Sequence, residues 1–372
     1  MNLRIPGPTP CPPEVLQAQV KQMVNHRGAE FAALLGRVNQ RLKQVFQTSS
    51  EIFVITTSGT GAMEAVVVNT LSPGDRVLAL TCGAFGDRFC EVSQAFGADV
   101  VRLEFPWGTA VDVDTVRQAL RKDASIKAIQ VVHNETSTGV TNSVKEIAAL
   151  ARESDKLLLV DAVSSLGALD LPMDAWGVDA IASASQKGFM VPPGVGLVAM
   201  GPKAWEANAR AKMPRYYLDL GKARGFQAKN QTPWTPAVST YYALDVALDM
   251  MLRKGLANIF ANHARLAQRT REGIKGLGLS LLVENESYAS NAVTAVRVPE
   301  GVDCSKLLRS MLEQGVELAE GQAKLSGKIF RIGHMGYVSE AEIDQVISTL
   351  GKVLPALGFK AKAPAAQRAT AR

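Results

Sequence analysis

Short apolar runs alternate with helix-like segments through the first two thirds of the chain, and this alternation limits the possible folds more than any other feature. Six runs of a few residues each are rich in Val, Ile, Leu and Ala: 52–57, 76–80, 99–105, 126–132, 156–161 and 178–185. Segments with helical apolar spacing lie between most of them. Short apolar strands that alternate with helices predict an α/β fold with a mostly parallel, doubly wound sheet covered on both faces.

The pattern changes after about residue 247. A long helical stretch leads to two strand-like segments, 292–300 and 328–334, that helical segments separate and follow. This predicts a smaller C-terminal α+β domain, and crevices between domains commonly hold ligands. We therefore expect four parts: an N-terminal arm near the active site (1–16), a large ligand-binding domain (17–246), a small domain (247–358) and a disordered basic tail (359–372).

The positive charge of the chain is concentrated at one end. The 372 residues carry a formal net charge of +6, and 359–372 hold four Lys and Arg residues with no acidic one. Removing those four charges leaves +2 for the rest of the chain. A nucleic-acid-binding protein needs basic residues clustered on a folded face, so we expect no nucleic-acid partner.

Other features of the composition point to an ordinary cytoplasmic protein. No apolar run approaches the ~20 residues of a membrane span, and the N-terminal residues lack an apolar signal region. The four cysteines have no CxxC spacing, and no pair of histidines is spaced like metal ligands. We therefore expect no membrane attachment and no metal site.

The residues that follow each predicted strand are expected to converge, because ligands of such sheets bind beyond the carboxyl ends of the strands. After the first run comes SGTGAMEA (58–65), whose glycines and helix start predict an anion site. Phe85 follows the second run, and the polar loop HNETSTG (133–139) follows the fourth. Asp161 ends the fifth run, and Lys187 follows the sixth among small residues.

One cofactor accounts for all of these positions. Taken singly, they also fit a plain strand-to-helix turn, a core phenylalanine or a polar turn. A buried carboxylate such as Asp161, however, needs a cation or a donor. Pyridoxal phosphate offers a phosphate for the helix N-terminus, a ring to stack on Phe85, a pyridinium nitrogen for Asp161 and an aldehyde for Lys187.

Five motifs in register resemble those of the class V pyridoxal-phosphate-dependent aminotransferases. They are SGTGAMEA, HNETSTG, DAVSSLG, SASQKG and KIFRIGHMG, and the opening IPGPTPCPPEV resembles the start of the alanine/serine–glyoxylate (or pyruvate) group. The resemblance covers nearly the whole chain except the tail. It implies fold type I of the PLP-dependent transferases.

The resemblance also implies a role for each matching residue. The residues that would bind the cofactor are Ser58, Gly59, Thr60, Phe85, Ser137, Thr138, Asp161, Val163, Gln186, Lys187, Thr232 and Thr235. Among these, Asp161 and Lys187 would be catalytic, and Phe85 stands where many relatives have tryptophan. Gly7 and Arg331 would lie at the substrate, with Arg331 holding its carboxylate. Thr232 and Thr235 would reach the phosphate of a neighbouring subunit, which implies a homodimer with shared active sites.

The function implied is transfer of an amino group from alanine or serine to glyoxylate or pyruvate through a Schiff base on Lys187. A pyridoxamine or ureido donor stays open. A PLP-dependent lyase or desulfurase is an alternative that needs a nucleophilic cysteine on a mobile loop. A nucleotide-cofactor dehydrogenase lacks its glycine fingerprint here, and a non-catalytic binding subunit would bind the cofactor without reacting.

Overall fold

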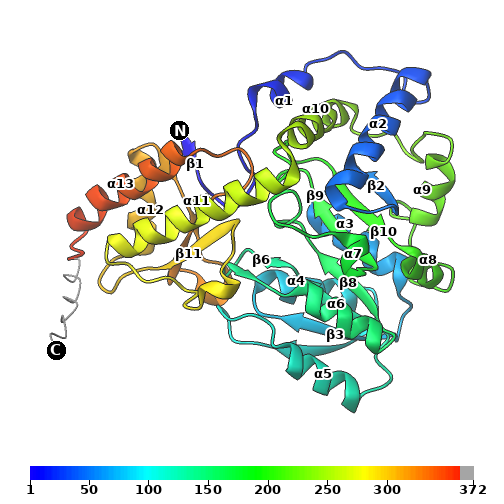
Figure 1. Ribbon diagram of the computed structural model, residues 1–372, viewed down its shortest axis with the longest axis horizontal. Coiled ribbons are helices and arrows are strands. Elements are labelled where there is room, and N and C mark those ends of the chain that lie inside the picture. The colour runs from blue at the N-terminus through cyan, green and yellow to red at the C-terminus, as the bar shows by residue number, and fades with distance from the viewer. Residues whose placement is uncertain (361–372) are drawn as a thin grey trace.

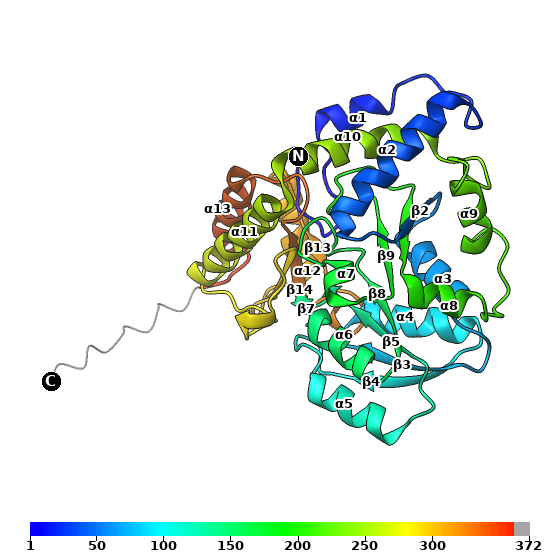
Figure 2. The ribbon, with the colours of Figure 1, turned by 45° about the vertical axis from the view of Figure 1, so that its right-hand side comes forward.

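The computed structural model describes residues 1–360, so the predicted tail (359–372) lies almost entirely outside the described residues. The chain forms a large lobe around a seven-stranded sheet and a smaller lobe beside it (Figure 1). Helix α11 (Leu256–Gly276) leads from the large lobe into the small one, as Figure 2 also shows. Among the described residues, no helix combines the length and the apolar character needed to cross a bilayer.

The large sheet is mostly parallel, as predicted. Its strands lie in the order β2-β10-β9-β8-β5-β3-β4. Their bounds are β2 (Glu51–Ile55), β3 (Arg76–Thr81), β4 (Asp99–Glu104), β5 (Ala128–Val132), β8 (Leu157–Asp161), β9 (Ala180–Ala184) and β10 (Gly196–Met200). Strand β10, which the alternation did not predict, runs antiparallel to both neighbours, and every other pair is parallel.

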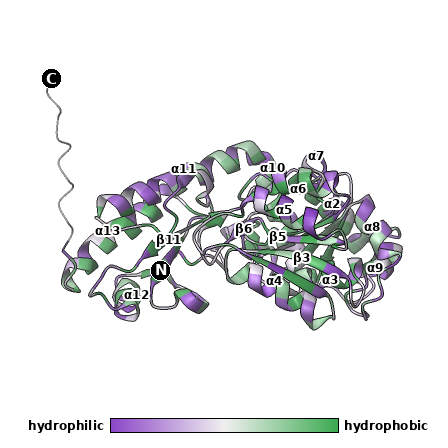
Figure 3. Cartoon of the chain, turned by 90° about the horizontal axis from the view of Figure 1, so that it is seen from below, coloured by the Kyte–Doolittle hydropathy of each residue, from purple (hydrophilic) through white to green (hydrophobic). Residues whose placement is uncertain are grey.

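Helices cover both faces of this sheet. Their bounds are α1 (Pro13–Ala18), α2 (Ala29–Phe46), α3 (Gly59–Thr70), α4 (Ala84–Ala95), α5 (Val113–Lys122), α6 (Val144–Glu153), α7 (Met173–Trp176), α8 (Pro202–Asn208), α9 (Leu220–Gln227) and α10 (Val238–Lys254). Strand side chains alternate between the faces: Leu158 packs in the core with α2, α6 and α10, whereas Leu159 packs with α3, α8 and α9. Figure 3 shows the apolar strands between these helical layers.

The small lobe is an α+β unit with its own core. Its sheet has the order β11-β14-β13, with antiparallel pairing throughout. The elements of the small lobe and its surroundings are β1 (Asn2–Leu3), β11 (Val293–Arg297), β12 (Val316–Glu317), β13 (Ala319–Glu320), β14 (Ile329–Gly333), α12 (Cys304–Glu313), α13 (Glu340–Ala356) and the 3-10 turns η1 (Glu286–Tyr288) and η2 (Ala323–Leu325). The short strands β6 (Asn134–Glu135) and β7 (Val140–Thr141) pair with each other in the loop that follows β5. Helix α10 continues across residues 246–247, so the domain division predicted there falls inside a helix and stays a prediction.

Candidate active site

The carboxyl ends of the parallel strands bring the predicted residues to one edge of the large sheet. Gly59, which follows β2, lies against Val163, which follows β8, and a Cβ on Gly59 would come within 2.9 Å of that valine. Ser137, in the loop after β5, accepts a hydrogen bond from the Ala84 N–H at the start of α4 (2.9 Å). Segments far apart in the sequence thus meet at one edge of the sheet.

Lys187 follows β9, and the N-terminal arm lies directly over its amine. The Nζ group donates a hydrogen bond to the Pro6 carbonyl, and a Cβ on Gly7 would lie only 2.5 Å from it. Burial lowers the pKa of Lys187 to about 8, with the positive charge of Arg331 acting in the same direction. The amine can therefore lose its proton near neutral pH, as a general base must.

Asp161 is a buried carboxylate at the end of β8. Its Oδ1 accepts a hydrogen bond from the Val163 N–H at 2.8 Å. Burial raises the pKa of Asp161 to about 7, although Lys187 and Arg88 oppose the shift. A buried carboxylate of this kind is stabilised when a cationic group of a ligand binds beside it.

The N-terminus of α3 is open toward a ligand. Ser58 is its N-cap, and the Ser58 side chain accepts a hydrogen bond from the Gly61 N–H at 3.4 Å. The amides of Gly59 and Thr60 in the first turn have no intrahelical acceptor. They lie at the positive end of the helix dipole, where an anion such as phosphate is stabilised.

The N-terminus of α4 is occupied by the carboxylate of Glu135. This fully buried group accepts hydrogen bonds from the N–H groups of Phe85 (3.2 Å), Gly86 (3.0 Å) and Ser137 (3.1 Å), and from the Ser137 hydroxyl (2.6 Å). Burial raises the pKa of Glu135, and these hydrogen bonds oppose that shift. Sequence analysis named the loop but gave Glu135 no role.

Arg331 lies on β14 and links the small lobe to the polar loop. It is 5% exposed, and its guanidinium donates to the carbonyl oxygens of Glu320 (2.8 Å) and Thr136 (3.2 Å) and to Oε1 of Gln322 (3.3 Å). Burial lowers its pKa to about 10, while Glu135 raises it. Arg331 has no ion-pair partner among the described residues.

Arg88, on α4, is a second cation at the site that sequence reasoning missed. Its guanidinium carbon lies 4.8 Å from the centre of the Phe85 ring, and Nη1 is 3.5 Å from the Thr60 hydroxyl at the open end of α3. Its charge also acts on Asp161 and Lys187. Arg88 lies one helical turn after Phe85, and this spacing was the only signal in the sequence.

Two further predicted positions lie within the loops of the site. The Gln186 carbonyl accepts from the Thr9 N–H (3.1 Å), whereas its side-chain Oε1 is buried without a partner in the described part of the chain. Thr138 is buried, and its N–H donates to the Glu135 carbonyl at 3.2 Å. His133, the first residue of the polar loop, is buried with its pKa lowered to about 4 by burial, and it packs edge-on against Trp176.

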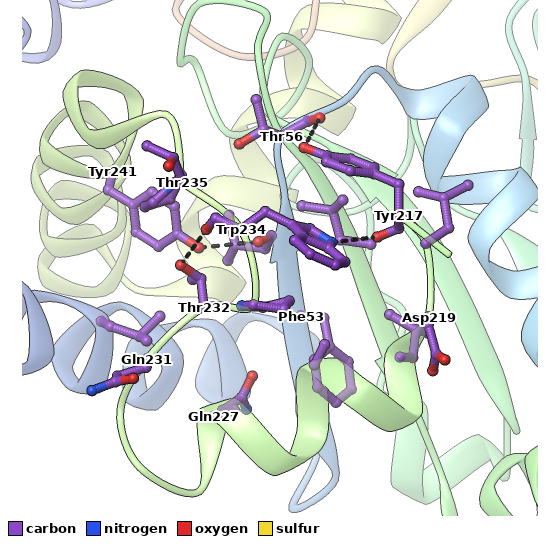
Figure 4. Close-up of a pocket in the computed structure, with 18 residues that line it drawn as sticks. Phe53, Thr56, Tyr217, Asp219, Gln227, Gln231, Thr232, Trp234, Thr235 and Tyr241 are labelled. Carbon is purple, nitrogen blue, oxygen red and sulfur yellow. Dashed lines mark hydrogen bonds between the residues drawn. The ribbon is translucent and has the colours of Figure 1, made fainter. Parts of the chain in front are cut away.

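Thr232 and Thr235 lie elsewhere on this chain. They line a pocket beside Trp234 and Tyr217, in which neither Lys187 nor Asp161 takes part (Figure 4). The Thr232 hydroxyl donates to the Trp234 carbonyl at 2.7 Å, and Thr235 is exposed. Within one chain, Thr232 and Thr235 therefore do not line the same site as Lys187 and Asp161.

Comparison with known proteins identifies the family. The family model described as Aminotransferase class-V matches residues 3–346. The chain belongs to the class V aminotransferases. It is 47% identical to the soluble hydrogenase 42 kDa subunit of Anabaena cylindrica, over 97% of this chain and 94% of that protein. It is 38% identical to the L-aspartate–glyoxylate aminotransferase of Paracoccus denitrificans, over 95% and 91% of the two chains.

A solved structure confirms the fold of this class V aminotransferase. The crystal structure of alanine–glyoxylate aminotransferase from Nostoc sp. superposes with a TM-score of 0.90 at 36% identity and covers 95% of this chain and 94% of that one. Fold type I, an enzyme of the transaminase type and pyridoxal phosphate as its cofactor are therefore confirmed.

The residues present fit this cofactor. The open end of α3 offers amide donors to a phosphate. The buried Oε1 of Gln186 has no partner among residues 1–360, so this acceptor is available to a donor group of a ligand. Asp161 is a buried carboxylate with a single amide donor. Among residues 1–360, no group of three or more His, Cys, Asp and Glu side chains is arranged to hold a metal ion.

Proposed function

We propose that this enzyme transfers the amino group of alanine or serine to glyoxylate or pyruvate, with pyridoxal phosphate held on Lys187 as a Schiff base. One arrangement carries the proposal. A lysine with a lowered pKa, a buried aspartate and an arginine that has no carboxylate partner among residues 1–360 lie close enough to affect one another's charge, at the edge of the sheet where α3 begins. Each group matches one part of the cofactor or of an amino acid.

The division of work among these residues follows from their charge. Bound pyridoxal phosphate supplies an electron sink for the carbanion that forms at the substrate Cα. Asp161 would hold a proton on the ring nitrogen, and Phe85 and Val163 would enclose the ring. Lys187 Nζ, once free and uncharged, would accept the Cα proton and return it at C4′ of the cofactor. Ser58, Gly59 and Thr60 would hold the phosphate, with Gln186 and Ser137 beside them.

Arg331 would set the substrate end of the site. Its planar guanidinium can bind both oxygens of an α-carboxylate, which would replace some of its present carbonyl acceptors. Gly7 lies against Lys187, so it would border the same substrate. Two of the relatives are named for alanine or L-aspartate as donor, with glyoxylate as acceptor. Arg331 accounts for one carboxylate, and Arg88, the second cation at the site, lies beside Thr60 at the end proposed for the phosphate. This division favours alanine or serine over aspartate.

The chemistry of the cysteines argues against a desulfurase. Burial raises the pKa of Cys82 to about 12 and those of Cys90 and Cys304 to about 11, and it also raises the pKa of Cys11. A nucleophilic thiolate needs the opposite shift.

The exposed aromatic residues near Thr235 support a homodimer. Trp234 stacks on Tyr216 (5.0 Å between ring centres) and on Tyr217 (6.2 Å), and Tyr216 is 71% exposed. Exposed aromatic clusters commonly mark protein interfaces. A second copy of the chain bound at this surface would place its candidate active site near Thr232 and Thr235 of the first copy. A Tyr216→Arg variant should shift the chain from dimer to monomer in light scattering after gel filtration; an unchanged dimer would place the interface elsewhere.

Half-reaction spectroscopy tests the proposed activity. The visible absorption of the cofactor-loaded enzyme is recorded, and L-alanine, L-serine or L-aspartate is added without a keto acid. We expect alanine or serine to bleach the band and glyoxylate or pyruvate to restore it. A band that no donor bleaches would support the binding-subunit alternative, which the name of the Anabaena cylindrica relative also suggests. Stronger bleaching by aspartate would overturn the donor assignment.

A further inference from the structure

Residues 2–9 form a segment, here called the strap, that runs from the small lobe to Lys187. At one end, β1 pairs in parallel with β12 of the small lobe: Asn2 N–H donates to the Gly315 carbonyl and Arg4 N–H to the Glu317 carbonyl, both at 2.8 Å. At the other end, the Thr9 N–H and hydroxyl donate to the carbonyls of Gln186 (3.1 Å) and Lys187 (3.0 Å). The strap therefore joins both lobes.

The middle of the strap touches both ends of the candidate active site within three residues. The Arg4 carbonyl accepts a hydrogen bond at 2.6 Å from Gly333, which lies two residues after Arg331 on β14. Any side chain at Gly333 would clash with the Ile5 carbonyl. The next residue, Pro6, accepts the hydrogen bond from the Lys187 amine. A shift of the strap would thus alter the Lys187 amine and the end of the Arg331 strand together.

The side chain of Arg4 fixes the strap to the small lobe. It is only 1% exposed, the largest side chain buried to this degree among the described residues. Its Nη2 lies 3.3 Å from Glu342 on α13, and its buried Nε and Nη2 have no hydrogen-bond partner among residues 1–360. The adjacent Asn2 side chain donates to the Glu342 carbonyl at 2.8 Å.

Stability alone does not explain an arginine in this position. A buried guanidinium with incomplete hydrogen bonding is costly, and an apolar side chain of similar volume commonly gives equal or better stability. Buried polar pairs are best attested as devices that fix one register among several. Here the register concerned is that of the strap against the small lobe.

We propose that Arg4 is a positioning residue: paired with Glu342, it sets the strap so that the Pro6 carbonyl and Gly7 hold the Lys187 amine at a fixed distance from Arg331. The substrate then meets its carboxylate clamp and its proton carrier in a preset geometry, which lowers the entropic cost of reaction. The role in turnover rests on the function proposed above. The anchoring itself does not.

Hydrogen exchange and kinetics of the full-length Arg4→Met enzyme test this role. We expect the amides of Arg4, Thr9 and Gly333 to exchange about tenfold faster, and the donor KM to rise by about tenfold with kcat falling less. Arg4→Lys, which keeps the charge, should recover part of the donor KM. Val353→Ala, in the small-lobe core away from the strap, should lower Tm without changing the exchange of Thr9 or the donor KM.

Each result decides the matter. Unchanged exchange at Thr9 and Gly333 in Arg4→Met would overturn the proposal. Faster exchange would also overturn it if KM and kcat, measured at a temperature below the Tm of the variant, equal those of the wild type. If wild type reacts with no donor, the proposed function fails, and the exchange at Thr9 together with borohydride trapping of the cofactor on Lys187 still decides whether Arg4 positions the amine. Should Arg4→Met not fold, Glu342→Gln removes the charge partner while keeping an acceptor for the α13 cap.

Discussion

Helices α3 and α4 begin at the same edge of the large sheet, yet their N-termini differ in what occupies them. The first turn of α3 is capped by the neutral Ser58 and leaves its leading amides free. The first turn of α4 is closed by the buried carboxylate of Glu135. Both ends are the positive end of a helix dipole, although the backbone differs at Ser58 and Gly83, so the group that occupies each end decides whether it can receive an anion.

This difference would give the proposed cofactor one orientation, with its phosphate at α3 and its ring beside α4. In the proposed site, the open end of α3 would attract the phosphate, while the carboxylate at α4 would repel it, and Phe85 lies in the first turn that this carboxylate holds. Glu135 also holds Ser137 and lies near Arg331, as its effect on the pKa of that arginine shows. The hydrogen bonds of Glu135 therefore fix the start of α4 and Ser137 beside the open end of α3.

Closing the open end should have the largest effect. Gly59→Asp would place a carboxylate at the start of α3 and press on Val163. Repulsion between two charges about 4 Å apart amounts to a few kcal/mol, so we expect the dissociation constant of pyridoxal phosphate to rise by about 100-fold. Absorbance titration of the cofactor-free chain measures it.

The matched control for this change is Gly276→Asp at the end of α11, where an added Cβ meets no atom within 4 Å. It should leave the dissociation constant unchanged. Equal affinities for Gly59→Asp and wild type would show that the phosphate does not sit at α3.

Opening the closed end should have the next largest effect. Glu135→Gln keeps the shape but turns an amide group toward the N–H donors of Phe85, Gly86 or Ser137. Leaving such buried donors unpaired costs about 2 kcal/mol, and the loosened Phe85 should weaken cofactor binding. Urea unfolding measures the first and absorbance titration the second.

Glu146→Gln serves as the control, because Glu146 lies in the exposed first turn of α6. It should change the free energy of unfolding by less than about 0.5 kcal/mol. If Glu135→Gln behaves like Glu146→Gln, the α4 end does not depend on its carboxylate.

A third test uses pH. The pKa of Lys187 is lowered from 10.5 to about 8. The fraction of Lys187 in its reactive, uncharged form therefore increases as the pH rises through 8. The rate of cofactor attachment to the cofactor-free chain should rise about tenfold per unit below pH 8 and level off above it. Stopped-flow absorbance follows this rate. A rise that continues to pH 10 would mean that the amine is unperturbed.

The smallest expected effect is on thermal stability, and it distinguishes the two buried carboxylates, Asp161 and Glu135. Asp161 has one amide donor, and its pKa is raised from 3.8 to about 7. Between these pH values the native state holds a proton that the unfolded state has lost, so stability falls as pH rises toward 7. Asp161→Asn avoids this loss, and the cofactor-free variant should melt a few degrees above wild type at pH 8.

At pH 4 the two melting temperatures should converge, because Asp161 is then largely protonated when folded. Glu135→Gln should shift Tm in the opposite direction at pH 8. Stabilisation by both substitutions, or by neither, would mean that the two carboxylates do not differ as described.

The sequence predicted the convergence at the site because strand ends in a parallel sheet must meet. Lys187, Asp161 and Phe85 were placed by that argument, and the motifs added Arg331 from the small lobe. The role of Glu135 could not be predicted in this way, since it depends on a contact with a helix 50 residues away. Arg4 was also missed, because a single arginine near an N-terminus gives no sign of burial.

Chemical mapping of the attachment site tests the central claim most directly. The cofactor-loaded enzyme is reduced with borohydride, digested and analysed by mass spectrometry, alongside a Lys187→Ala variant. We predict one pyridoxyl group, on the peptide that contains Lys187, and none in the variant. A label on another lysine, or equal labelling in Lys187→Ala, would contradict the account.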